Sequence, residues 1–196
     1  MNRSSAGTVA GLLLAAGSGQ RFGGDKLLTL TREGMPMGVQ AAHRLCRALA
    51  PGPVYAAVRA DDHALAAMLK EVGCQVVTME GGGMGDSLAR LVTVARSKTP
   101  AVVAWLVALA DMPWVREETL VAVAAAAAAH SIPVAPCLDG RRGHPVGFPA
   151  GMSDALCALT GDTGARGLIE RLGLHRLEVD DDGILRDVDT PADLDR

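Results

Sequence analysis

Apolar residues along this chain follow two alternating patterns. Continuous apolar runs are typical of strands buried on both faces, whereas apolar residues spaced three or four apart are typical of helices with one buried face. The runs predict strands over residues 8–16, 54–58, 75–79, 101–110 and 132–136, and the spaced patterns predict helices over 38–50, from a cap at Asp61 to Gly73, through 88–95 and over 117–130. This alternation predicts a three-layer α/β sandwich with a mostly parallel central sheet.

The regular alternation ends near Cys137. Residues 138–148 are polar and rich in glycine, which predicts a hairpin-like insertion, and short helices are expected near 151–159 and 164–172. Two further strands, 174–179 and 184–188, are expected to flank the acidic run 180–183, which is typical of an exposed turn rather than of a calcium loop. We therefore expect one domain over residues 1–196, with a substrate-facing insertion around 137–172.

Composition narrows the class of protein. With 49% apolar but only 3% aromatic residues, the core must rely on Ala, Val and Leu, and a formal net charge of −3 argues against nucleic acid as a partner. The four cysteines show no Cys-x-x-Cys spacing, which favours reduced thiols over a zinc site or a disulfide framework. No apolar run reaches the roughly 18 residues of a membrane helix. We therefore expect a cytoplasmic protein that does not bind a membrane.

The strongest chemical signal is the loop that follows the first apolar run. Residues 13–26 read Leu-Leu-Ala-Ala-Gly-Ser-Gly-Gln-Arg-Phe-Gly-Gly-Asp-Lys. Gly17 and Gly19 allow the backbone to approach a ligand closely, and their N–H groups can face an anion. Arg21 adds a planar guanidinium and Lys26 a compact ammonium, and both suit phosphate oxygens. Since a plain turn needs neither cation, the loop predicts a polyphosphate site.

Two common glycine loops do not fit this segment. A dinucleotide fingerprint requires Gly-x-Gly-x-x-Gly, but Phe22 stands at its last position. A P-loop requires Gly-Lys-Ser/Thr, but Asp25 precedes Lys26 and Leu27 follows it, so the hydroxyl that binds magnesium is missing. The spacing instead resembles the signature Leu-x-x-Gly-x-Gly-x-Arg, followed five residues later by Lys, of nucleotidyltransferases with a Rossmann-like fold.

Two acids are candidates for a metal site. Asp111 directly follows the apolar run 101–110, at the expected carboxyl end of a buried strand. Ligands of open α/β sheets bind at this edge, and a carboxylate there can hold the Mg²⁺ of a bound polyphosphate. Asp189, before a Thr-Pro pair, is a second carboxylate for the same ion, although it can instead cap a short terminal helix. The loop cations and these acids are expected to converge on one metal-bound nucleoside triphosphate.

Two further glycine-rich segments carry weaker signals. In residues 81–88, glycines precede an expected helix, where the backbone can contact a flat or anionic ligand, although Asp86 or Ser87 can simply cap that helix. In residues 140–148, Arg141 and Arg142 can receive an anionic substrate. His144 lies in the same segment, and a lone histidine of this kind is more often structural than catalytic.

Five segments, in order, match one family: the loop of residues 13–26, Gly83-Met84-Gly85 with Ser87, Ala110-Asp111-Met112-Pro113, Gly143-His144-Pro145-Val146, and Asp187-Val188-Asp189-Thr190-Pro191. Together with residues 161–166 they resemble the molybdenum cofactor cytidylyltransferase branch of the MobA-like nucleotidyltransferases, over nearly the whole chain. The resemblance implies a Rossmann-like sandwich of the nucleotide-diphospho-sugar transferase type. It also implies transfer of CMP from CTP to the phosphate of a molybdopterin cofactor, with release of pyrophosphate.

The resemblance also assigns roles to residues. The nucleotide-binding residues it implies are Leu14, Ala15, Ala16, Gly17, Ser18, Gly19, Arg21, Lys26, Gly83, Met84, Gly85 and Ser87. Those implied to be catalytic are Arg21, Lys26 and Asp111, those for Mg²⁺ are Asp111 and Asp189, and those for the acceptor are Arg141, Arg142 and His144. The implied partners are CTP, a molybdopterin-type acceptor and, transiently, a molybdoenzyme or its chaperone.

Details of the resemblance bear on the choice of nucleotide. Ala16 stands where the guanylyl branch usually has glycine, so its methyl group narrows the base slot and favours a pyrimidine. Asp86 stands where the cytidylyl branch often has a small hydroxyl residue, and residues 29–36 are less regular than usual. Alternatives are therefore a guanylyltransferase or a sugar- or alditol-phosphate nucleotidyltransferase of the same fold. A non-catalytic nucleotide-binding protein in cofactor delivery is a third, against which the presence of both Asp111 and Asp189 argues.

Overall fold

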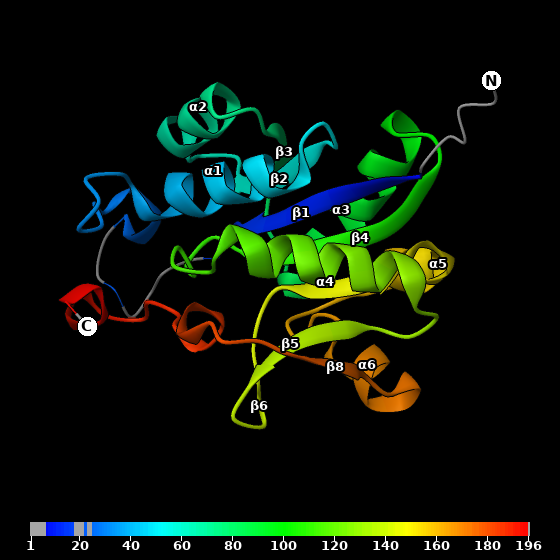
Figure 1. Ribbon diagram of the computed structural model, residues 1–196. Coiled ribbons are helices and arrows are strands. Elements are labelled where there is room, and N and C mark those ends of the chain that lie inside the picture. Colours follow the sequence, from blue (N-terminus) through cyan, green and yellow to red (C-terminus); the bar gives the residue numbers. More distant parts are fainter. Residues whose placement is uncertain (1–6, 18–21, 23–24, 196) are drawn as a thin grey trace, which may run out of the picture.

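One continuous eight-stranded sheet forms the centre of the molecule in a computed structural model, which describes residues 7–17, 22 and 25–195 (Figure 1). The strands lie in the order β3-β2-β1-β4-β7-β5-β6, with β8 paired to β5. Their bounds are β1 Thr8–Ala15, β2 Val54–Arg59, β3 Gln75–Met79, β4 Val102–Leu109, β5 Val134–Leu138, β6 Arg141–Arg142, β7 Val146–Pro149 and β8 His175–Glu178. Strands β1 to β4 are mutually parallel, whereas β7 is antiparallel to β4 and to β5.

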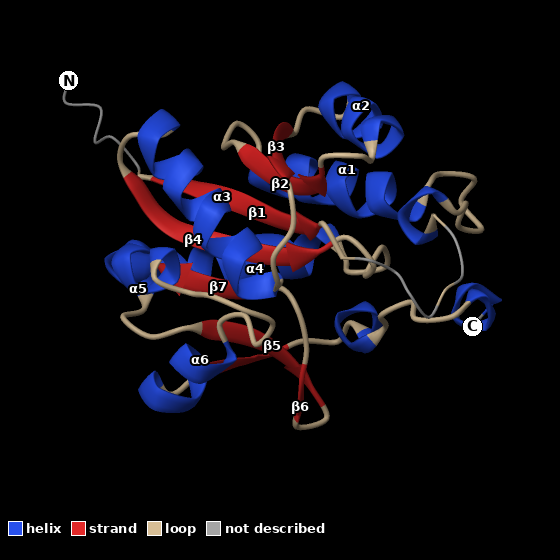
Figure 2. Cartoon of the chain, turned by 180° about the vertical axis from the view of Figure 1, so that it is seen from behind, coloured by secondary structure: helices blue, strands red, loops and turns tan. Residues whose placement is uncertain are grey.

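Helices cover both faces of this sheet. Their bounds are α1 Met37–Leu49, α2 His63–Glu71, α3 Met84–Lys98, α4 Glu117–Ala129, α5 Ser153–Cys157 and α6 Arg166–Leu172, and short 3₁₀ helices span Lys26–Leu28, Ala150–Met152, Asp182–Leu185 and Pro191–Asp195. Figure 1 shows α1 and α4 across one face, and Figure 2, from behind, shows α3 and α5 on the other. The predicted three-layer sandwich with a mostly parallel sheet is confirmed.

Alternation along β1 divides the core between the two faces. Leu13 is fully buried against α1 and α4, in the cluster that contains Leu45 and Val123. The next residue toward the N-terminus, Leu12, is fully buried on the opposite face, in the cluster that contains Leu91 and Trp105. Because successive side chains of a strand point to opposite faces, a strand buried on both sides must be apolar, as the sequence of β1 is after Thr8.

Most predicted elements occur within a few residues of their expected bounds, but the cap of α2 is displaced by one residue. The side chain of Asp62, not Asp61, accepts a 3.1 Å hydrogen bond from the backbone N–H of Leu65. Asp61 instead lies 3.3 Å from Nε of Arg59 in an ion pair. Two adjacent aspartates are equivalent as caps in a sequence, and only the direction of the chain leaving β2 decides between them.

The hairpin predicted for residues 138–148 is correct only in part. Leu138 and Arg141 pair across a turn at Asp139 and Gly140, both of which have positive φ. Val146–Pro149, however, forms β7, which lies in the interior of the sheet between β4 and β5. A four-residue strand that contains a glycine and a proline shows no periodicity, so only its pairing identifies it.

The acidic run 180–183 is not an exposed hairpin turn, and residues 184–188 are not a strand. Asp181 is buried, and its carboxylate accepts hydrogen bonds from the N–H of Arg116 at 2.9 Å and from the hydroxyl of Thr119 at 2.6 Å. It also accepts one from the N–H of Gly183, which opens the 3₁₀ helix Asp182–Leu185. The chain after β8 therefore attaches to the start of α4.

Among the residues that the structure describes, no helix has the length and apolarity needed to cross a bilayer.

Candidate functional site

A large cavity opens at the edge where β1 to β4 end. Its volume is about 770 Å³, and its walls come from the segments that follow these strands and from the start of α3. The lining residues are Leu14, Ala16, Gly17, Arg59, Ala60, Asp61, Met79, Glu80, Gly81, Gly82, Gly83, Met84, Ser87, Leu109, Asp111 and Asp162. A cavity of this size suits a small-molecule ligand, and its place matches that of ligands in open α/β sheets.

Lys26 lies between the two predicted metal-binding acids. Its Nζ is 2.8 Å from Oδ2 of Asp111 and 3.6 Å from Oδ1 of Asp189. The lysine side chain is only 12% exposed, compared with 29% for Asp111 and 52% for Asp189, so the ammonium is largely removed from water. One cation position is therefore shared by two carboxylates, of which Asp111 lines the large cavity and Asp189 lines a neighbouring pocket.

Backbone contacts bring these two carboxylates together. The N–H of Val188 donates a 3.0 Å hydrogen bond to the carbonyl oxygen of Asp111, which joins the C-terminal segment to the end of β4. The carboxylate of Asp193 then accepts hydrogen bonds from the N–H groups of Asp189 and Thr190. Asp193 thus holds the turn at Asp189. Asp193 was not predicted to have a role, although a carboxylate three residues after Thr190 stands at a common capping distance.

Arg59 is a cation of the site that the sequence analysis did not identify. It lines the large cavity and also a smaller one, of about 80 Å³, whose wall includes Ala15, Lys26 and Asp111. A signal was available: Arg59 ends β2 and Glu80 follows β3 directly, while Asp111 is the second residue after β4. Polar residues at the ends of three parallel strands must meet at one edge of the sheet.

Most of the described residues expected to bind the nucleotide lie in these cavity walls. Leu14, Ala16, Gly17, Gly83, Met84 and Ser87 line the large cavity, and Ala15 lines the smaller one. Gly85 lies in neither wall, because its N–H donates a 2.7 Å hydrogen bond to the carbonyl oxygen of Gly161. Ser18, Gly19 and Arg21 lie outside the described residues.

Asp86 has a structural contact that its sequence position only partly suggested. Its Oδ2 accepts hydrogen bonds from the N–H of Gly83 at 2.8 Å and from the N–H of Gly161 at 3.1 Å. The first bond caps α3, as the alternative interpretation of this residue predicted. The second bond joins α3 to a distant loop, which the sequence could not show.

The three residues predicted to bind the acceptor lie away from these cavities. Arg141 and Arg142 form β6 and are exposed at the end of the sheet. His144 lines a separate small pocket with Leu45, Met112 and Pro145 between α1 and α4, not the wall that contains Asp111. Their proposed role therefore has no support from the cavity geometry.

His144 has an unusual environment for a histidine. Its Nδ1 is buried, and within the described part of the chain no group forms a hydrogen bond with it. Burial, reinforced by the positive charge of Arg142 and opposed by Asp111, lowers the pKa of His144 to about 4. The imidazole is therefore neutral at pH 7.

The carboxylates of Asp111 and Asp189 suit Mg²⁺ that is bound together with a polyphosphate. Across the described residues, no three His, Cys, Asp or Glu side chains form a preformed metal centre. Mg²⁺, however, is usually held by one or two carboxylates while substrate phosphates and water complete its coordination. Asp111 and Asp189, which already flank the single charge of Lys26, are such a pair.

The parallel sheet, the cavity at its carboxyl edge and the Lys–Asp–Asp cluster together define a nucleotide-handling α/β enzyme. Residues 11–177 match the model of the MobA-like NTP transferase domain. The chain belongs to this family, and it is a nucleotidyltransferase. No curated protein sequence is similar enough to count as a match.

Solved structures agree with this assignment. Rv0371c from Mycobacterium tuberculosis H37Rv is 25% identical, with a TM-score of 0.82, and the match covers 98% of this chain and 97% of that one. A homologue of it from Mycobacterium sp. strain JC1 is 26% identical, with a TM-score of 0.79 over 96% of this chain and 93% of that one. A nucleotidyl transferase from Methanothermobacter shares the fold at 19% identity, with a TM-score of 0.79 over 95% and 94%.

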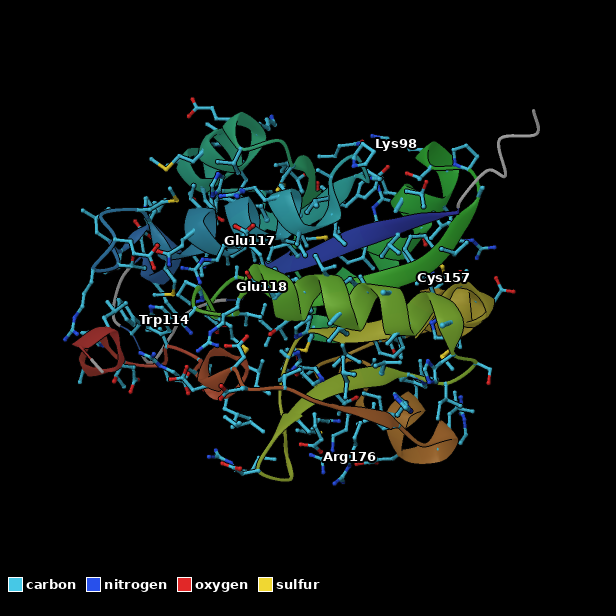
Figure 3. The ribbon with its side chains drawn as sticks, in the orientation of Figure 1. Lys98, Trp114, Glu117, Glu118, Cys157 and Arg176 are labelled. Carbon is cyan, nitrogen blue, oxygen red and sulfur yellow. The ribbon has the colours of Figure 1, made fainter. Side chains whose placement is uncertain are left out.

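The C-terminal segment also carries an aromatic contact next to the site. The guanidinium of Arg186 lies 4.2 Å from the ring centroid of Trp114. Figure 3 labels Trp114, which lies between the start of α4 and the C-terminal segment. A cation over an aromatic face is an attractive contact, and it adds to the bonds that hold residues 180–189 against the end of β4.

Proposed function

We propose that this nucleotidyltransferase moves CMP from CTP to the phosphate of a molybdopterin cofactor and releases pyrophosphate. The observation that carries the proposal is the position of Lys26, 2.8 Å from Asp111 and 3.6 Å from Asp189, in the wall of the small cavity that shares Arg59 and Asp111 with the 770 Å³ cavity. Cations and metal-binding acids at one end, and room for a nucleoside at the other, suit a nucleoside triphosphate.

Lys26 binds the triphosphate in this proposal. In the structure its ammonium donates a 2.8 Å hydrogen bond to Asp111. A bound triphosphate competes for the same ammonium, which then compensates the negative charge that builds up on the departing pyrophosphate. Arg21, which follows the glycines of the same loop, supplies a second positive charge. Gly17 leaves its part of the wall open, since no described atom lies within 4 Å of a β-carbon placed on it.

Asp111 and Asp189 would hold Mg²⁺, and this ion supplies charge neutralisation for the triphosphate. The protein residues themselves need little acid–base chemistry, because a phosphate oxygen of the acceptor is already nucleophilic at neutral pH. Their task is to align that oxygen with the α-phosphorus. Alignment of two bound reactants contributes about 7–11 kcal/mol to lowering a barrier of this kind.

The proposal for CTP rests on Ala16. Its side chain lies in the cavity wall beside Gly17, so the methyl group takes space that a glycine would leave to a purine. Arg141, Arg142 and His144 stay a prediction for the acceptor, as does contact with a molybdoenzyme or its chaperone.

The test is pyrophosphate release by the purified protein with Mg²⁺ and each nucleoside triphosphate, with and without molybdopterin. We expect release with CTP only when molybdopterin is present, and a product that contains CMP. Release that requires GTP, or that occurs with a sugar phosphate and not with molybdopterin, would contradict the proposal. Those outcomes identify the guanylyl and sugar-phosphate alternatives.

A further inference from the structure

We propose that the loop of residues 160–164 is part of the nucleotide site, and that Asp162 in this loop selects a base with an exocyclic amino group, as in cytosine. In this proposal Asp86 is the positioning residue that holds the loop in place. The inference rests on the proposed function, since it assumes that the nucleoside occupies the 770 Å³ cavity.

Two hydrogen bonds join this loop to the start of α3, and a third, within the start of α3, uses the same carboxylate oxygen. The N–H groups of Gly83 and Gly161 both donate to Oδ2 of Asp86, at 2.8 and 3.1 Å. In the opposite direction, the N–H of Gly85 donates to the carbonyl oxygen of Gly161 at 2.7 Å. One carboxylate oxygen thus connects two segments that are far apart in the sequence. The loop cannot move away from the cavity without breaking these bonds.

Close packing places Asp162 against the glycine run. A β-carbon on Gly83 would overlap Oδ1 of Asp162 and the backbone of Gly161, so only glycine fits at position 83. Further along the loop, a β-carbon on Gly164 would lie 2.9 Å from the sulfur of the Met84 side chain, and Gly164 has a positive φ that favours glycine. The two segments therefore interlock side by side.

Asp162 lies in the wall of the large cavity and is exposed. Among residues that the structure describes, none donates a hydrogen bond to its carboxylate. Asp61, another acid of the same wall, is paired with Arg59 instead. The Asp162 carboxylate is thus able to accept a hydrogen bond from a ligand.

The distribution of charge along the two cavities indicates whether Asp162 faces the phosphates or the base of the ligand. Lys26 lines the smaller cavity, which shares Leu14, Gly17, Arg59 and Asp111 with the large one, whereas Asp162 borders only the large cavity, where Gly83 and Met84 lie. A carboxylate repels phosphates but accepts hydrogen bonds from amino groups. Cytosine presents the N4 amino group as a donor, whereas uracil presents an acceptor oxygen at the corresponding position. Asp162 should therefore favour CTP over UTP, two ligands of equal charge and nearly equal size.

The experiment measures binding of CTP and of UTP in the presence of Mg²⁺, without any acceptor, by calorimetry. We expect the unmodified protein to bind CTP at least about tenfold more tightly than UTP. Asp162→Asn should reduce this ratio to about two or less, because the amide can also donate to uracil. Asp139→Asn is the matched control: Asp139 lies at the tip of the β5–β6 turn, with a positive φ that asparagine tolerates, and its substitution should leave the ratio unchanged.

Variants of Asp86 test the positioning role. Asp86→Ala should lower the CTP:UTP ratio as Asp162→Asn does, although residue 86 need not touch the nucleotide. Asp86→Asn should restore most of the ratio, because its amide oxygen can accept both N–H groups. If Asp86→Ala fails to fold, Asp162→Asn still tests the selection of the base, and Asp86→Asn still tests the positioning role of residue 86. A merely structural role for Asp86 would lower affinity for both nucleotides equally, and this would overturn its part of the inference.

The possible failures are distinguishable. Strong CTP preference that survives in Asp162→Asn overturns the inference and leaves the proposed function intact. A relaxed ratio in Asp162→Asn, with no CMP transfer to molybdopterin by the unmodified protein, supports the inference and contradicts the proposed acceptor. Equal binding of CTP and UTP by the unmodified protein overturns the inference alone, whereas binding of GTP alone overturns both.

Discussion

The backbone N–H of Val188 donates a 3.0 Å hydrogen bond to the carbonyl oxygen of Asp111. This bond places the C-terminal segment across the end of β4, so that the carboxylates of residues 111 and 189 lie on either side of the Lys26 ammonium. A backbone bond to Asp111, together with the Asp193 carboxylate that holds the turn at Asp189, therefore assembles the acidic pair. The acids can be substituted individually without removing the contact that brings them together.

Substitution of Asp111 tests the metal assignment. Asp111→Asn keeps the side-chain shape and leaves the backbone bond to Val188 available, but removes the negative charge. We expect pyrophosphate release to fall by at least about a hundredfold, as is typical when one charged group of a phosphoryl-transfer site is lost. The thermal unfolding midpoint should stay close to that of the unmodified protein. Turnover at the normal rate in this variant would remove Asp111 from the metal site.

Asp189 and Asp187 form a matched pair for a second prediction. Both acids line the neighbouring pocket with Trp114 and Arg186, but it is Asp189 that lies 3.6 Å from Lys26. We expect Asp189→Asn to raise the Mg²⁺ concentration for half-maximal activity by about tenfold, because one carboxylate ligand is lost. Asp187→Asn should change it less than twofold. Titration of activity with Mg²⁺ makes the measurement, and equal effects of the two variants would be inconsistent with the assignment.

Lys26 should contribute to nucleotide affinity. Lys26→Ala removes the positive charge beside the cavity and leaves Asp111 facing the phosphates, so we expect CTP to bind at least about tenfold more weakly. Lys98→Ala is the control, because Lys98 ends α3 at the far edge of the sheet (Figure 3). Calorimetric titration with CTP checks both variants. An unchanged affinity in Lys26→Ala would show that Lys26 does not hold the triphosphate.

His144 should make stability depend on pH. Its pKa is lowered to about 4 in the folded protein, mainly by burial, and is about 6.5 in an unfolded chain. Between these values the unfolded state binds more protons, so the stability that is complete above pH 6.5 is lost progressively as the pH falls toward 4. The difference corresponds to at most about 3 kcal/mol.

Denaturant unfolding at pH 7.5, 6, 5 and 4 measures this effect. His144→Gln removes the titrating imidazole. The unfolding free energy of this variant should therefore fall less between pH 6.5 and 4 than that of the unmodified protein. His63→Gln, at an exposed position, should follow the unmodified protein. Parallel curves for His144→Gln and the unmodified protein would contradict the buried, neutral imidazole.

Asp181 is predicted to be a major contributor to stability. Asp181→Ala leaves the N–H of Arg116 and the hydroxyl of Thr119 without their acceptor at the start of α4. Loss of a buried, charged hydrogen-bond acceptor typically costs about 3 kcal/mol or more. Asp182→Ala is the control, since that side chain is 68% exposed, and its unfolding free energy should change by less than about 0.5 kcal/mol. Similar unfolding midpoints for the two variants would be evidence against the structural role of Asp181.

Local sequence was sufficient for the layers of the fold. The apolar runs of β1 and β4 and the spaced apolar residues of α1 and α3 specify strand and helix without reference to the rest of the chain, because burial on both faces or on one face leaves different periods. Local sequence was also sufficient to identify Lys26 and Asp111 as candidate site residues, since each stands close to a recognisable strand or loop.

The sequence did not determine elements whose identity depends on a distant partner. Val146–Pro149 is a strand only because β4 and β5 pair with it, and Asp181 is buried only because α4 begins beside it. Arg59 likewise became part of the site through the order of the strands. In each of these cases the residue type permits several local conformations of similar energy, and long-range contact selects one.

The chain by itself thus determined the three layers, the glycine loop and Asp111 close behind a strand, because periodicity and residue chemistry are local properties. Only the tertiary structure decided which of these groups meet. It brought Asp189 beside Lys26, left Arg141 and Arg142 at the exposed β6, and placed Asp162 in the cavity wall through Asp86. Such encounters depend on strand order and loop packing, which no short stretch of sequence encodes.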